Sequence, residues 1–117
     1  MSKGEEYLTQ ALATVQDVTG QLATLAGDDA KVEALRDRLA DLSALLASTE
    51  GRFFLRSKLC LPFARRCQEE AAALAALVAS SDGDPQGLDR VAEALSSLEL
   101  ASRTLDERST MDGMAIT

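Results

Sequence analysis

The side chains best suited to binding or catalysis lie close together in the sequence, between Gly51 and Cys67. This stretch contains five basic residues and no acidic one, whereas the rest of the chain has 12 − 5 = 7 basic and 19 acidic residues, a balance of −12. A local positive charge of this kind attracts an acidic protein surface, a nucleic-acid backbone, an anionic membrane face or a small anion. We therefore predict a binding site in this basic segment (residues 52–66), formed by Arg52, Arg56, Lys58, Arg65 and Arg66.

The basic segment also holds every phenylalanine of the chain, at Phe53, Phe54 and Phe63. Winding it as a helix, at about 100° per residue, places Phe53 and Phe63 on the side that a protein core requires, together with Cys60, Ala64 and Cys67. Stacking on bases and insertion into lipid both need exposed apolar side chains. We therefore expect neither nucleic acid nor a membrane as the main partner and prefer a protein with an acidic surface.

Arg56 is the exception among the five basic residues, because the same winding places it on the apolar side. A structural interpretation makes it a snorkelling arginine or one half of a buried salt bridge with an acid of the core. A functional interpretation makes it an anion-recognising group in a partly covered pocket. We prefer the structural interpretation, and expect Lys58, Arg65 and Arg66 to cluster on the opposite, polar side.

The two cysteines are the next candidates for chemistry. Cys60 and Cys67 are seven residues apart, so on a continuous helix they share a face but lie roughly 10 Å apart along its axis, too far for a disulfide, which needs Cα atoms within about 7 Å. The chain has no histidine and no CxxC motif, so we predict no metal site and no cofactor. We expect both thiols in the core. The alternative is a reactive thiol beside Arg65 and Arg66, in a redox or metal protein.

The sequence has few of the residues and motifs that other enzyme mechanisms require. The absence of histidine removes the commonest general base. The chain also lacks the glycine-rich phosphate-binding motifs and the GxSxG nucleophile motif. Adjacent carboxylates such as Glu69 and Glu70 splay around a helix and indicate a solvated face. We therefore predict that the protein is not an enzyme.

The elements that must position these groups are helical, because Ala and Leu supply a third of the 117 residues. Apolar residues recur in alternating steps of three and four, which predicts amphipathic helices. The first helix is expected over 3–26, opened by a Ser2/Glu5 capping box, with a stripe of Leu8, Ala11, Val15, Val18, Leu22 and Leu25. The second is expected over 29–49, with a stripe of Val32, Leu35, Leu39, Leu42 and Leu46.

The third helix is expected over 52–80 and contains Pro62, which removes a backbone donor and disfavours helical geometry at Leu61. We prefer one helix kinked near Pro62 to a separate short helix over 52–60. The fourth helix is expected over 85–108, with Asp84 as N-cap and Pro85 in its first turn. Its stripe is Leu88, Val91, Leu95, Leu98, Ala101 or Ser102, and Leu105.

These four stripes predict an all-α protein, an antiparallel four-helix bundle formed by one domain over 1–108, with a flexible C-terminal tail over 109–117. An intertwined dimer that completes the bundle is the alternative, and we expect a homodimer or a complex with another protein. No apolar run approaches the roughly 20 residues that cross a bilayer. The polar start of the chain and its two cysteines favour a cytoplasmic location for this acidic protein.

The sequence as a whole therefore favours a non-enzymatic interaction or adaptor protein that docks an acidic partner through the basic segment. Two alternatives remain: a binder of a small anionic ligand or nucleic acid that uses the same segment, and a thiol-based redox or metal protein that uses Cys60 and Cys67.

Overall fold

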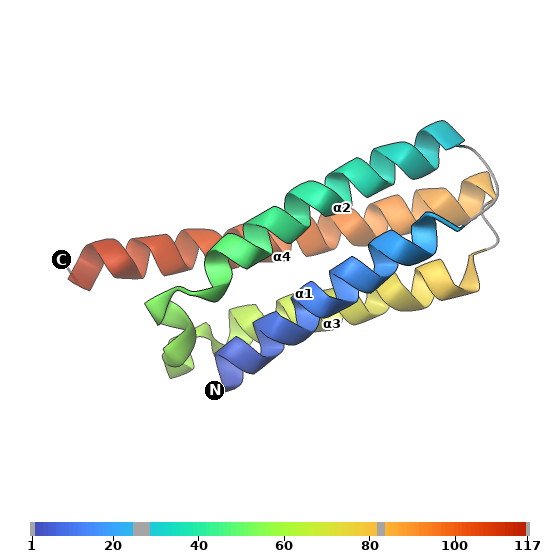
Figure 1. Ribbon diagram of the computed structural model, residues 1–117. Coiled ribbons are helices and arrows are strands. Elements are labelled where there is room, and N and C mark those ends of the chain that lie inside the picture. The colour runs from blue at the N-terminus through green and yellow to red at the C-terminus, as the bar shows by residue number, and fades with distance from the viewer. Residues whose placement is uncertain (1, 25–28, 82–83, 117) are drawn as a thin grey trace.

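The protein is an all-α helical bundle. The computed structural model describes residues 2–24, 29–81 and 84–116, with side chains over 2–24, 30–81 and 84–110. Two 3₁₀ turns, η1 and η2, connect the second helix to the third (Figure 1). In order, the elements are α1 (Lys3–Leu22), α2 (Asp29–Glu50), η1 (Phe53–Arg56), η2 (Lys58–Cys60), α3 (Leu61–Ser80) and α4 (Pro85–Ile116).

Consecutive helices run in opposite directions, as expected for an antiparallel bundle (Figure 1). The α1–α2 and α3–α4 pairs lie side by side, so that α1 packs against α3 and α2 packs against α4. The start of α1, the end of α4 and the α2–α3 connection lie together at one end of the bundle (Figure 1). Since α2 and α3 occupy diagonal corners, their connection must cross the end of the bundle.

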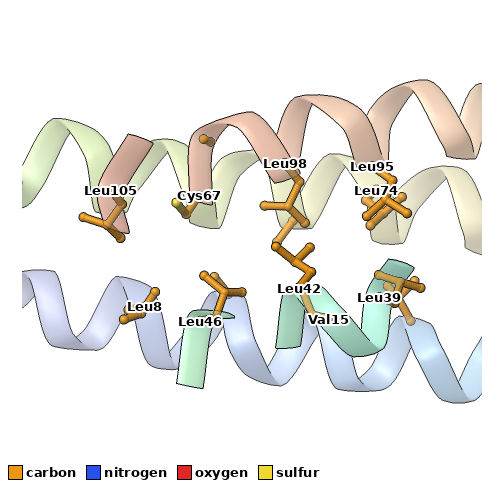
Figure 2. Close-up of a cluster of buried hydrophobic side chains, with 14 of the residues drawn as sticks. Leu8, Val15, Leu39, Leu42, Leu46, Cys67, Leu74, Leu95, Leu98 and Leu105 are labelled. Carbon is orange, nitrogen blue, oxygen red and sulfur yellow. The ribbon is translucent and has the colours of Figure 1, made fainter. Parts of the chain in front are cut away.

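The core follows the predicted stripes closely. Every stripe residue that we expected in the second and fourth helices is buried, as are those of the first helix up to Leu22. Leu25 lies outside the described residues. Figure 2 shows leucines of α2 and α4 meeting Val15 of α1 and Leu74 of α3 in the middle of the bundle. In α3 the buried residues are Ala64, Cys67, Ala71, Leu74 and Val78, with Phe63 and Leu77 partly buried beside them.

The prediction of one kinked helix over 52–80 is wrong. The chain leaves α2 at Glu50, forms the two 3₁₀ turns and enters α3 at Leu61. Pro62 lies in the first turn of α3, where no intrahelical bond needs its missing N–H. The separate short helix that we considered over 52–60 is closer to the structure, but the segment bends at Ser57, which has an extended backbone. The chain therefore crosses the diagonal between α2 and α3 in two short turns and not in one straight helix.

The fourth helix is longer than expected, because α4 continues to Ile116 instead of ending at 108, through most of the predicted tail. Its buried stripe continues beyond Leu105 in a polar residue, Ser109, which the apolar pattern could not reveal. Arg52 donates hydrogen bonds to Ser109 Oγ and Thr110 Oγ1, at 3.0 and 2.6 Å. These bonds attach the last described side chains of α4 to the α2–α3 connection.

The start of α1 lies directly against that connection. The predicted capping box is present: Ser2 Oγ accepts from the Glu5 amide at 3.3 Å, and Glu5 Oε1 accepts from the Ser2 amide at 3.2 Å. Gly4 is buried against Cys60 and Leu55, and a Cβ at this position would overlap Cys60 Sγ and lie 2.5 Å from the Leu55 carbonyl oxygen. The connection packs this closely because residue 4 has no side chain.

We therefore predict that Gly4→Ala lowers the free energy of unfolding by about 1–3 kcal/mol, as is usual for an overpacked site. Gly20 is a matched control in the same helix, since a Cβ there would meet nothing within 4 Å. Gly20→Ala should raise the free energy of unfolding by about 0.5–1 kcal/mol through helix propensity. Urea denaturation followed by circular dichroism measures both, and equal effects would contradict the close packing at Gly4.

Candidate functional site

The five predicted site residues do not all have the same surroundings. Arg52 lies between the helices, with Nη1 at 2.7 Å from Asp106 Oδ1 and at 3.1 Å from the Asp106 carbonyl oxygen. The buried Thr49 hydroxyl also contacts Asp106 Oδ1, at 3.3 Å. Arg52 therefore holds the start of the connection against α4, and all of these contacts are made by its Nη1.

The middle of the connection is held from the opposite side, at the Leu55 carbonyl oxygen. This oxygen accepts from Ser2 Oγ at 2.9 Å and from Cys60 Sγ at 3.3 Å. The Leu55 and Phe54 side chains are buried, and the Phe54 ring lies 6.4 Å from the ring of Phe63. One face of the connection is thus packed into the end of the bundle.

The other face exposes two large apolar side chains. Phe53 is 69% exposed and Leu59 is 71% exposed. The expectation that Phe53 belongs to the core is wrong, because 3₁₀ turns have about three residues per turn and the chain bends at Ser57. Phe54 and Leu55 point inward in its place. Two large apolar side chains are therefore exposed within a strongly basic segment.

Arg56 is exposed, so its expected place on the apolar side is wrong, and it forms neither a buried salt bridge nor part of a covered pocket. Its guanidinium lies 5.6 Å from the centre of the Phe53 ring, in a cation–π arrangement. The change has the same cause as that of Phe53, since both residues belong to η1. Arg56 and Phe53 therefore form one exposed basic and aromatic pair.

The other three basic residues are exposed, as the helical winding predicted. The Arg65 guanidinium lies 5.7 Å from the ring centre of Tyr7, and Lys3 Nζ lies 5.7 Å from the same ring. Arg66 Nε lies 3.9 Å from Glu70 Oε1, one turn along α3, and the Arg66 side chain is 66% exposed. We call the surface formed by Phe53, Arg56, Lys58, Leu59, Arg65 and Arg66 the basic apolar end.

Two acidic side chains near this surface, Glu5 and Asp106, are held by contacts within the bundle. The hydrogen bonds that the Ser2 side chain and backbone give to Glu5 lower its carboxyl pKa, and the positive charge of Arg56 lowers it further. Asp106 is held by Arg52, away from the exposed face. The exposed part of the basic apolar end therefore has more positive than negative side chains.

A groove between α3 and α4 adjoins the basic apolar end. It has a volume of about 330 Å³ and is lined by Pro62, Phe63, Arg66, Leu100, Ala101 and Thr104. Leu100 is 62% exposed at its rim, and the Arg108 guanidinium lies 5.5 Å from the ring centre of Phe63. Sequence reasoning missed Leu100 and Arg108 as candidate site residues. The available signal was that Leu100 is an apolar residue outside the stripe of the fourth helix.

Both cysteines are buried and unpaired, which confirms their expected place in the core. Burial, with a smaller effect of the Glu5 charge, raises the pKa of the Cys60 thiol. Burial also raises the pKa of the Cys67 thiol from 9.0 to about 11, although Ser102 and Arg66 partly oppose this rise. Among the described residues, the buried Ser102 hydroxyl makes no hydrogen bond. Both shifts are opposite to those that activate a cysteine.

Across the described residues, no group of three or more Asp, Glu or Cys side chains is arranged to hold a metal ion. Within the same ranges, none of the helices combines the length and the apolar character that crossing a membrane requires.

Comparison of the chain with protein-family models, with curated proteins and with solved structures finds no match.

We predict that Arg52→Met destabilises the bundle, because it removes the partner of Asp106, Ser109 and Thr110 while keeping most of the apolar stem. The free energy of unfolding should fall by about 1–3 kcal/mol. Arg36→Met is the control, since Arg36 is exposed on α2, and it should change stability by less than about 0.5 kcal/mol. Similar losses in urea denaturation of the two variants would show that Arg52 is not an anchor.

A second prediction concerns pH. Folding favours the neutral thiol of Cys67, so its contribution to stability is present below about pH 9 and is lost as the pH rises towards 11. The stability advantage of the wild type over Cys67→Ala should therefore shrink, by on the order of 1–2 kcal/mol, between these pH values. Urea denaturation of both proteins measures it, with the variant correcting for all other titrating groups. A constant difference across this range would mean that the Cys67 pKa is not raised.

Proposed function

We propose that this protein is a non-enzymatic interaction module that docks an acidic protein partner through the basic apolar end. The single observation that carries the proposal is the exposure of Phe53 and Leu59 beside four exposed cationic side chains. Apolar side chains in the centre of an interface supply affinity, and surrounding charges select and steer a partner of opposite sign. This combination supports a protein surface as the partner.

A protein is favoured over a small anion by the shape of the surface. Arg56 and Arg65 each lie over an aromatic ring, and Arg66 lies near Glu70. Their guanidinium groups are thus spread over the end of the bundle, whereas a small anion is bound by donors that converge on one point. Nucleic acid is less favoured because Arg56 already lies over Phe53, the exposed aromatic ring on which a base would have to stack.

The proposal separates Arg52 from the other four basic residues. Arg52 is bound to α4, so it supports the surface from beneath instead of contacting the partner. We also propose a cytoplasmic location, which the two unpaired thiols support. A second copy of this chain is one possible acidic partner, since its net charge is −7.

The test is a charge reversal of Arg56, Lys58 and Arg65 to Glu. Each change adds −2, so the net charge goes from −7 to −13. Immobilised wild-type protein should retain an acidic protein from a lysate of the source cells at about 0.05 M salt and release it at about 0.5 M, because salt screens exposed charges. The triple variant should retain none of it while keeping the helicity and melting temperature of the wild type.

The matched control reverses Arg36, Arg90 and Arg103, which are exposed on α2 and α4. It has the same net charge of −13, and should still retain the partner. Loss of binding in both triple variants would mean that overall charge, not the basic apolar end, decides binding. Retention by the first triple variant would place the docking surface elsewhere. Sedimentation equilibrium of the wild type alone shows whether the acidic partner is a second copy.

A further inference from the structure

The α3–α4 groove has the features of a docking site for one helix of a partner. We infer that it receives the apolar face of an acidic amphipathic helix. This inference rests on the proposed function and goes beyond it, because it names the structural class of the partner segment and assigns its contacts to residues outside the basic segment: Leu100, Ala101, Thr104 and Arg108.

The lining of the groove is suited to apolar side chains. Pro62 and Phe63 form the α3 wall, while Leu100 and Ala101 form much of the α4 wall. Its volume of about 330 Å³ is at the lower end of the range for ligand sites, about 300–1,000 Å³. Leu100 remains 62% exposed at the rim, so an occupant would remove it from water. Removal of apolar surface from water favours association.

One basic side chain lines this groove, and a second lies over the ring of a lining residue. Arg66 lines it on α3, and Arg108 on α4 lies over the Phe63 ring. The exposed contact between Arg66 and Glu70, at 3.9 Å, is of a kind that contributes little, so an incoming carboxylate can replace it.

The α4 acids closest to this part of the helix point mainly away from the groove. Glu99 pairs with Arg38 of α2, and Asp106 pairs with Arg52. Glu107 is the exception, because it is exposed two turns beyond Leu100 on the same side of α4. The positive side chains at the groove therefore complement an acidic segment.

A helix fits this site better than an extended peptide or a flat surface does. A groove between two packed helices accepts the side-chain ridge of a third helix. Apolar residues at positions i, i+3, i+4 and i+7 would enter the groove, while acidic residues on the flanks would meet Arg66 and Arg108. A membrane surface is flat and would not enter the groove, so membrane binding is an outcome that the test must detect.

The probe is a fluorescein-labelled synthetic helix of about 18 residues, or five turns, with Leu at i, i+3, i+4 and i+7 and Glu at most other positions. Its control has the same composition with the leucines distributed around the helix. Fluorescence anisotropy with the full chain should show binding of the amphipathic peptide at least about tenfold tighter than that of the control. Equal affinities would overturn the inference, because an apolar face would then not matter.

Two variants test the groove itself. Thr104→Trp fills it, and Leu100→Gln removes the exposed apolar side chain without changing charge. Each should weaken peptide binding by about tenfold or more. Thr14→Trp is the matched control, because Thr14 on α1 is similarly half-buried and, like Thr104, donates to the carbonyl four residues before it. Circular dichroism checks that all three variants remain folded. If Thr104→Trp does not fold, peptide binding by Leu100→Gln alone tests the groove.

The outcomes separate this inference from the proposed function. If the groove variants bind the peptide normally while the Arg56, Lys58 and Arg65 reversal abolishes both peptide binding and partner capture, the groove is wrong and the proposed function stands. If the groove variants lose the peptide while the reversal leaves partner capture intact, the proposed function fails. If the protein ignores the peptide but binds vesicles containing phosphatidylserine, the partner is a membrane and the inference is overturned.

Discussion

The Leu55 carbonyl oxygen marks the contact on which the end of this bundle depends. It lies where the α2–α3 connection crosses the diagonal, and it accepts from Ser2 at the start of α1 and from the Cys60 thiol. Gly4 lets α1 approach because it has no side chain to occupy the space beside Cys60. The crossing packs against α1 and α4, so this close contact and the Arg52 anchor on α4 together determine its path.

That path explains why the residues of one basic segment lie in two different environments. Where the connection leaves α2, Arg52 satisfies acceptors on α4 and stabilises the bundle. Beyond it, the 3₁₀ turns direct Phe54 and Leu55 inward and leave Phe53, Arg56 and Leu59 outside. A 3₁₀ turn of three or four residues cannot bury all of its apolar side chains on one side, so packing its inner face exposes part of its outer face. The exposed part is the proposed docking surface.

The same packing buries both cysteines and disfavours their thiolate forms. Cys60 lies beneath the connection as a small buried donor. Cys67 of α3 lies in the core opposite leucines of α4 (Figure 2). Burial favours the neutral thiol at both positions and outweighs the positive charge of Arg66 beside Cys67. Basic neighbours in the sequence activate a thiol only when they share its environment, and Arg65 and Arg66 point to the surface of α3.

The sequence by itself determined the four helices, the Ser2/Glu5 capping box, the buried stripes and the burial of both cysteines, because heptad spacing and capping are local properties. It also located the basic segment, since charge composition is local too. Tertiary structure alone decided the break before Pro62, the length of α4, the anchoring role of Arg52 and the exposure of Phe53 and Arg56. Each of these depends on the diagonal crossing between α2 and α3, which brings residues about fifty positions apart into contact. A repeat of three and four residues carries no information about contacts at that separation.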